Sequence, residues 1–150
     1  MVMHIKNVLN VPGTKQAFDT CVPEERLEQI AGLVFRTPVT VKGAIENRAG
    51  VVTLTMQIAC TQLFTCDRCL KELVREFSYD EEHLVVRALE NEDMEDRYIV
   101  ARGESIDIAE IAVTDLLLRL PSKTLCREDC KGLCPVCGCD RNVTDCGCEG

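Results

Sequence analysis

Aromatic and imidazole side chains are scarce in this sequence of 150 residues, which has no tryptophan, two tyrosines and two histidines. So few rings argue against a base-stacking platform for single-stranded nucleic acid. The histidines, His4 and His83, each stand alone in strand-like sequence, where a histidine is more often structural than catalytic. No glycine-rich phosphate loop and no serine nucleophile elbow is present. We therefore expect a protein that is not an enzyme and has no small-molecule substrate.

Basic residues are also in deficit, with 17 lysines and arginines against 25 acids and a formal net charge of −8. Coating nucleic acid by bulk electrostatics needs an excess of cations, so an RNA contact would have to be local or run through a partner protein. No run approaches the roughly 18 apolar residues of a membrane span. Residues 1–10 lack a secretory signal pattern. The expected location is cytoplasmic, without membrane contact.

Cysteine, by contrast, is abundant: the chain has eleven, and seven of them lie within the 23 residues from Cys126 to Cys148. In the cytoplasm thiols stay reduced, so these cysteines are better interpreted as ligands than as disulfides. An odd number also fits a complete disulfide framework poorly. Because such a segment has little capacity for an apolar core, we expect a bound metal to hold it folded.

The segment Cys134-Pro-Val-Cys137-Gly138 has the spacing with which zinc is commonly bound on a tight turn. A glycine after the second ligand permits the positive φ that turns backbone N–H groups toward sulfur. Its natural partner pair is Cys146 and Cys148, which would complete a compact site of four thiolates. Cys139 is either a spectator or a competitor of Cys146 or Cys148, and the sequence leaves this open.

The pair Cys66-Asp-Arg-Cys69 has the same spacing, although Leu70 follows it instead of glycine. A thioredoxin-type redox pair and two buried structural thiols are alternatives. Cys126 and Cys130 follow a helix expected to cross the sheet, which would bring them back near Cys66 and Cys69. All-cysteine sites are typical of structural zinc, with an iron–sulfur cluster as the less favoured alternative. We therefore predict one or two zinc ions, held by Cys66, Cys69, Cys126 and Cys130 in one site and by Cys134, Cys137, Cys146 and Cys148 in the other.

The rest of the chain predicts an α+β fold, a curved antiparallel sheet with one main helix. Apolar residues alternate with polar ones from Val51 to Cys60, as in a half-buried strand. A helix is expected over 108–120, with Asp107 and Glu110 at capping-box spacing and a proline as its stop. We expect a core domain over 1–120 and a cysteine-rich tail over 121–150. Further predictions are strands over 3–9, 39–46, 70–79, 83–86 and 97–100, a hairpin connection over 47–50, a short helix over 23–31 and a solvated acidic loop over 90–96.

The tail from Leu120 to Cys148, together with Cys66-x-Arg-Cys69-Leu70, resembles the bacterial YceD family. This family is also called the large ribosomal RNA subunit accumulation protein family and is predicted to bind metal. The resemblance implies a role in accumulation of 23S ribosomal RNA and no known catalysis. The family pattern has asparagine and an apolar residue near Asn142, which fits here, whereas Cys139 and Asp140 depart from it.

The resulting hypothesis is a non-enzymatic factor of large-subunit biogenesis, which binds ribosomal RNA or a ribosomal protein through a zinc-stabilised surface. Two rivals remain: a protein-binding zinc adaptor without RNA contact, and a thiol redox sensor that uses Cys66 and Cys69. The cations that could reach phosphates, unless they are simply solvated surface charges, are Lys123, Arg127, Lys131 and Arg141.

Overall fold

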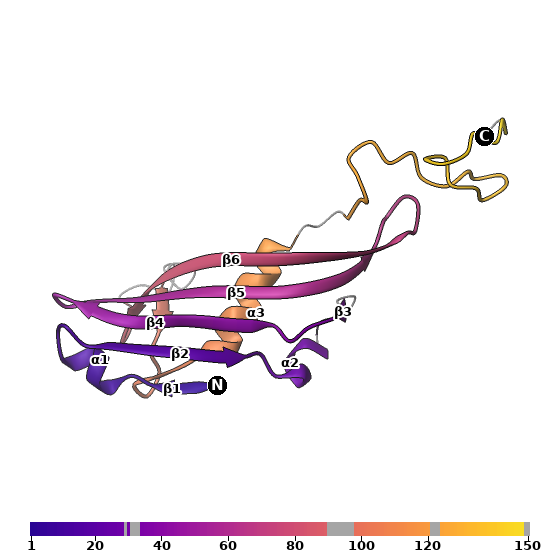
Figure 1. The fold of residues 1–150 in the computed structure, drawn as a ribbon. Coiled ribbons are helices and arrows are strands. Elements are labelled where there is room, and N and C mark those ends of the chain that lie inside the picture. The colour runs from indigo at the N-terminus through magenta and orange to yellow at the C-terminus, as the bar shows by residue number, and fades with distance from the viewer. Residues whose placement is uncertain (29, 31–33, 90–97, 121–123, 149–150) are drawn as a thin grey trace.

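One long curved sheet dominates the chain (Figure 1). The computed structural model describes residues 1–28, 30, 34–89, 98–120 and 124–148. The sheet has the strand order β2–β4–β5–β6–β7, with β3 paired to β5, and a separate two-stranded sheet joins β1 to β8. The strands are β1 (Val2–His4), β2 (Lys15–Cys21), β3 (Val34–Phe35), β4 (Thr40–Arg48), β5 (Val51–Thr65), β6 (Glu72–Val86), β7 (Tyr98–Val100) and β8 (Ser105–Asp107). The helices are α1 (Lys6–Asn10), α2 (Glu24–Glu28) and α3 (Ile108–Arg119).

The central strand β5 confirms the alternation that the sequence predicts and is longer than predicted. Its even-numbered side chains from Val52 to Gln62 are buried, while the odd-numbered ones are exposed or half-buried. The β4–β5 turn is a two-residue connection in which Ala49 and Gly50 both have positive φ. Such turns match the right-handed twist of an antiparallel pair. The hairpin predicted over 47–50 is therefore confirmed.

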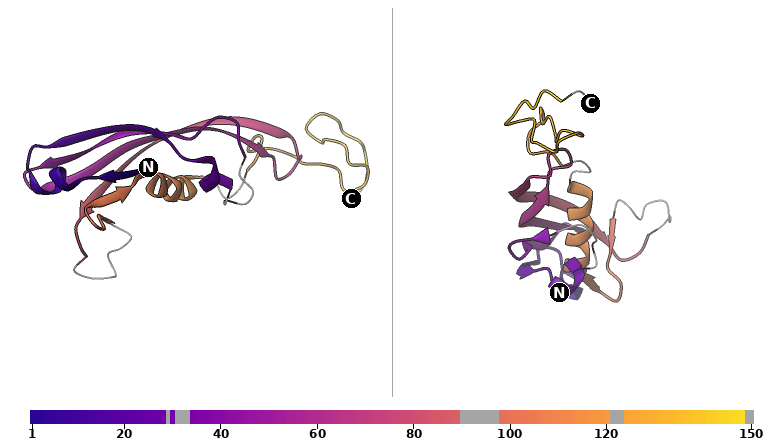
Figure 2. Two further views of the ribbon diagram at one scale, coloured as in Figure 1. Left: turned by 90° about the horizontal axis from the view of Figure 1, so that it is seen from below. Right: turned by 90° about the vertical axis from the view of Figure 1, so that its right-hand side faces the viewer.

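Helix α3 lies along the concave side of the arched sheet (Figure 2). Ile108, Ala112 and Leu116 are fully buried there, which places their apolar stripe against the sheet. The Asp107 carboxylate accepts hydrogen bonds from the N–H groups of Ala109 and Glu110 at 3.1 and 3.3 Å. The predicted main helix and its N-cap are thus confirmed.

The predicted strand over residues 3–9 is wrong beyond His4, because α1 begins at Lys6. Strand β1 pairs with β8 over three residues only, so beyond His4 the chain has no neighbouring strand to hydrogen-bond with. Within α1, the side chain of Val8 is fully buried. The buried side-chain amide of Asn47 donates to the backbone carbonyl of Val8 at 2.7 Å. One further difference is local: β7 pairs with β6 in parallel, within an otherwise antiparallel sheet.

Some predicted elements lie partly or wholly outside the described residues. Of the helix predicted over 23–31, α2 forms residues 24–28, Pro23 and Ile30 are described but not helical, and residues 29 and 31 lie outside the described part. The predicted acidic loop over 90–96 lies wholly outside it. Among the described helices, none is long and apolar enough to cross a membrane.

Among the described residues, the buried apolar side chains form two separate clusters. The larger one lies between the sheet and α3, and the smaller one lies at the far end of the β5–β6 hairpin. The tail leaves the end of α3 and returns to this hairpin end (Figure 1). The smaller cluster consists of Cys66, Cys69 and Cys130, with Leu73, Leu125, Cys126 and Leu133 packed against them.

Candidate metal centres

The turn that joins β5 to β6 carries the Cys66–Cys69 pair. The N–H of Cys66 donates to the carbonyl of Lys71 at 2.9 Å, and the N–H of Leu70 donates to the carbonyl of Cys66 at 3.0 Å. Leu70 has φ +59°, the left-handed conformation that glycine adopts most easily. The chain therefore forms the ligand turn without the glycine that the Cys134 pair has, and the leucine side chain is left exposed.

Four cysteines from two distant segments meet at this turn, and we call them the first centre. The sulfurs of Cys66, Cys69, Cys126 and Cys130 all lie within 4.8 Å of one another. The Sγ atoms of Cys66 and Cys130 are 3.7 Å apart, and those of Cys69 and Cys126 are 3.6 Å apart. Each sulfur of the hairpin turn thus faces one sulfur of the tail. This arrangement could hold a metal ion.

Backbone and side-chain N–H groups point at two of these sulfurs. The N–H of Cys69 lowers the pKa of Cys66 most strongly, to about 6, and the N–H of Cys126 contributes at 3.3 Å. The Asn142 amide lowers the pKa of Cys130, with Nδ2 3.3 Å from the sulfur. Burial and the neighbouring thiols raise the pKa of Cys126 to about 12. Because four thiolates repel one another, only a bound cation would keep all four deprotonated.

The two residues between the ligand cysteines hold the tail in place. Asp67 bonds Thr124 twice, from its own N–H to the carbonyl at 2.8 Å and from the Thr124 N–H to its carboxylate at 2.9 Å. The Arg68 guanidinium donates to the carbonyl of Cys130 at 2.9 Å. The roles of Asp67 and Arg68 do not follow from cysteine spacing, and their position inside a Cys-x-x-Cys turn is the one signal of them in the sequence.

A second group of cysteines lies within the tail, and we call it the second centre. The sulfurs of Cys134, Cys137, Cys139 and Cys146 lie within 4.8 Å of one another. The set differs from the predicted one because Cys139 takes the place expected for Cys148. The cause is a tight turn in which the Cys134 N–H donates to the Cys139 carbonyl at 2.8 Å. That bond brings Cys139 back to the turn formed by Cys134 and Cys137.

The thiols of the second centre have strongly different environments. The N–H groups of Cys137 and Val136 lower the pKa of Cys134 to about 6. Hydrogen bonds with Cys137 and Cys146 raise the pKa of Cys139 to about 12. The pKa of Cys148 is raised to about 11, chiefly by Cys146 and Cys137, so this fifth thiol is also close. Five thiols therefore crowd a place where one tetrahedral ion needs four.

The described cations among those predicted to contact phosphate lie in different surroundings. Arg127 contacts Asp129, with Nε 3.3 Å from Oδ1, and its Nη2 donates to the Asn142 side chain at 2.8 Å. Lys131 is exposed, and Arg141 is half-buried. Lys123 lies outside the described residues.

A cluster of titratable groups joins α3 to β6 away from the cysteines. His83 Nε2 lies 2.7 Å from Asp115 Oδ2, and Arg119 donates from Nε to Glu81 at 2.5 Å. Glu81, His83 and Asp115 are close enough together to hold an ion. However, Arg119 already supplies a positive charge there, so the cluster is better described as a polar latch between the helix and the sheet.

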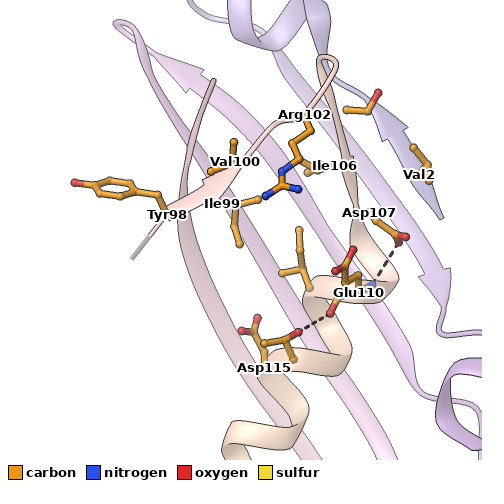
Figure 3. Close-up of a pocket in the computed structure, with 12 residues that line it drawn as sticks. Val2, Tyr98, Ile99, Val100, Arg102, Ile106, Asp107, Glu110 and Asp115 are labelled. Carbon is orange, nitrogen blue, oxygen red and sulfur yellow. Dashed lines mark hydrogen bonds between the residues drawn. The ribbon is translucent and has the colours of Figure 1, made fainter. Parts of the chain in front are cut away.

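A cavity of about 590 Å³ opens between β7, β8 and the first turns of α3 (Figure 3). Three of its polar side chains already have hydrogen-bond partners. Asp107 caps α3 and contacts Arg26 at 2.6 Å, and Thr114 donates to the carbonyl of Glu110 at 3.0 Å. Asp115, at the edge of the cavity, bonds His83. The two cysteine centres therefore offer the better-defined chemistry.

Comparison with known proteins points to the same part of the chain. A family model described as "Large ribosomal RNA subunit accumulation protein YceD" matches residues 54–150, which include both centres and α3. Similar curated relatives are an uncharacterized protein of Mycobacterium bovis and two of Mycobacterium tuberculosis, from strains CDC 1551 and H37Rv. Each is 29% identical over 102 residues, which are 63% of this chain and 47% of the relative. The chain thus spans about half the length of these relatives, and no solved structure matches it significantly.

Proposed function

The chain belongs to the YceD family, and from that premise we propose that it is a non-enzymatic factor for the accumulation of 23S ribosomal RNA and so for large-subunit biogenesis. The family description carries the role in large-subunit RNA accumulation. What we add is a physical basis, in which two structural zinc ions fold the tail and fix it to the end of the sheet.

The spacing of sulfurs in the first centre is the observation that carries this proposal. Zinc–sulfur bonds of about 2.3 Å in a regular tetrahedron give sulfur–sulfur edges of about 3.8 Å. The pairs at 3.6 and 3.7 Å are close to that value. A four-iron cluster would interpose its own iron and sulfide between the thiolates and hold them farther apart. The spacing thus supports a single ion in the first centre.

A structural role for the metal follows from the donor set. A catalytic zinc keeps one coordination position open for water or substrate, whereas four thiolates close the ion off. Zinc would supply charge neutralisation and a fixed geometry. Asp67 and Arg68 bind the returning tail by hydrogen bonds. The tail then presents a rigid surface beyond the end of the β5–β6 hairpin.

The partner in this proposal is large-subunit ribosomal RNA or a ribosomal protein, met in the cytoplasm. Lys131 and Arg141, together with Lys123, are the residues proposed to reach phosphate, because Arg127 is engaged within the tail. The excess of acids over bases favours the second candidate, an adaptor that binds a basic ribosomal protein without RNA contact. A redox pair is less well supported, because Cys66 and Cys69 each face a cysteine of the tail.

Deletion and complementation test the proposed function. Cells without the gene should accumulate less 23S ribosomal RNA and fewer large-subunit particles, and the wild-type chain should restore both. Cys66→Ser combined with Cys130→Ser should fail to restore them, whereas Cys21→Ser, an exposed thiol on β2, should restore them fully. Normal 23S ribosomal RNA levels in the deletion strain would refute the proposal.

Pull-down of large-subunit precursors by the intact chain, before and after nuclease, separates the two partner classes. Loss of capture after nuclease indicates RNA contact. Retained capture of a basic ribosomal protein indicates the adaptor.

A further inference from the structure

We infer that Asn142 is a positioning residue of the first centre and that, through it, metal binding at the second centre strengthens metal binding at the first. This inference rests on the metal binding in the proposed function. It goes beyond it, because a side chain that is no metal ligand joins two centres that would otherwise be independent.

The Asn142 side chain uses its full hydrogen-bonding capacity. Nδ2 donates to the sulfur of Cys130 at 3.3 Å and to the carboxylate of Asp140 at 2.9 Å. Oδ1 accepts from the N–H of Lys131 at 2.9 Å and from the guanidinium of Arg127 at 2.8 Å. An amide has two donor hydrogens and two acceptor lone pairs, so all four are engaged.

These partners also fix which way the amide points. In the opposite orientation the carbonyl oxygen would face the Cys130 sulfur and the Asp140 carboxylate, both rich in electrons. The NH₂ group would then face the donors of Lys131 and Arg127. Only the orientation described gives four favourable contacts, so the N–H···S bond to Cys130 is a defined feature of the site.

The position of Asn142 in the chain links it to the second centre. It lies between Cys139 and Cys146, inside the loop that ligation of these two cysteines would close. On one side of this loop, Leu133 and Asp140 form a β-bridge and the Arg141 N–H donates to the Gly132 carbonyl at 3.0 Å. Ligation of Cys146 closes the other side. The loop that carries the amide is therefore held from both ends only when the second centre is complete.

An N–H donated to a ligand sulfur favours the thiolate and orients it toward the metal. Removing such an outer-shell partner typically lowers metal affinity by about 10–100-fold. A metal at the second centre that orders Asn142 raises the metal affinity of the first centre. Because linkage is reciprocal, a metal at the first centre raises the metal affinity of the second by the same factor. Asn142 is thus proposed to make the two centres load cooperatively.

Variants of the intact chain separate donor and acceptor roles of the amide. Asn142→Ala removes both, whereas Asn142→Asp keeps an acceptor for Lys131 and Arg127 but loses the donor to Cys130. Val143→Ala is the matched control, because this neighbouring side chain is 83% exposed. Each variant is loaded with zinc, challenged with a chelator and alkylated, and the four cysteines of the first centre are followed peptide by peptide.

The expected result is about 10–100-fold weaker zinc retention at the first centre in both Asn142→Ala and Asn142→Asp, with Val143→Ala like wild type. In cobalt-loaded protein, the sulfur-to-metal charge-transfer band should move to lower energy in both Asn142 variants, because the sulfur loses a hydrogen bond. Cys146→Ser combined with Cys148→Ser leaves three thiols at the second centre, and adding Asn142→Ala to this pair should weaken the first centre no further.

Three results would overturn the inference. These are wild-type retention in Asn142→Ala, wild-type retention in Asn142→Asp, and an additive effect of Asn142→Ala on the variant that lacks both Cys146 and Cys148. A wild-type chain that holds no metal at either centre would instead refute the metal binding in the proposed function, and the inference with it.

Discussion

Single residues decide how closely the tail approaches the Cys66–Cys69 turn. Gly132 has φ +76°, and a Cβ there would lie 3.2 Å from the backbone oxygen of Arg68. The N–H of Leu133 donates to that same oxygen at 3.3 Å. A side chain at residue 132 would therefore meet both an unfavourable backbone conformation and a backbone atom of the turn. Glycine is required here for close approach as well as for φ.

Gly132→Ala should therefore loosen the first centre. The left-handed conformation costs about 1–2 kcal/mol for a residue with a side chain, and the contact with Arg68 adds to it. We expect faster zinc release from the cysteines of the first centre, measured by chelator challenge and peptide-resolved alkylation. Gly13→Ala is the matched control, because Gly13 has φ +86° with nothing within 4 Å of its Cβ position and lies outside both centres. Equal retention in wild type and Gly132→Ala would contradict the close approach.

Among the secondary-structure elements, α3 is the one that fixes where the tail begins. Its start is defined by Asp107, whose carboxylate caps the helix and contacts Arg26 at 2.6 Å. Burial raises the pKa of Asp107, but the N–H of Glu110 and the charge and hydrogen bond of Arg26 outweigh it, so the net pKa lies below 3.8. The charged form is thus favoured in the folded chain.

Asp107→Ala should lower the free energy of unfolding by about 1 kcal/mol, as loss of an N-cap does. The unfolded chain binds a proton at this carboxyl more readily than the folded chain, so its contribution is fully present above pH 3.8 and is lost as pH falls through the lower folded pKa. Urea titrations at neutral and acidic pH should therefore show a smaller difference between wild type and variant at acidic pH. A difference that grows as the pH falls would contradict this assignment.

These elements also show what the sequence could predict. Strand β5 and helix α3 were predictable because each buries one face. Apolar residues therefore recur every two residues along the strand and about every 3.6 residues along the helix. The change from β1 to α1 was not, because it depends on β8 beginning at Ser105, which pairs with His4 from a distant part of the sequence. The parallel pairing of β7 with β6 likewise depends on tertiary contact that no local period encodes.

In the molecule as a whole, the cysteine pairs were predictable from spacing, but the way they group depends on the fold. That the tail meets the β5–β6 turn follows from the length of the hairpin and the direction of α3, and the sequence suggested it only through that helix (Figure 1). The place of Cys139 beside Cys134 depends on one backbone hydrogen bond, which spacing does not encode. Asn142 had a family pattern, but its contact with Cys130 is visible only in three dimensions.

Two four-thiolate centres, one between tail and sheet and one within the tail, are the basis of the whole proposal. Native mass spectrometry of reduced protein, loaded with zinc and then desalted, counts the ions directly. Wild type should carry two zinc ions, and Cys66→Ser should carry one, at the second centre. Cys134→Ser combined with Cys137→Ser leaves three thiols at the second centre, so this variant should carry one ion, at the first centre. One ion or none in the wild type, or two in either variant, would contradict the two-centre structure.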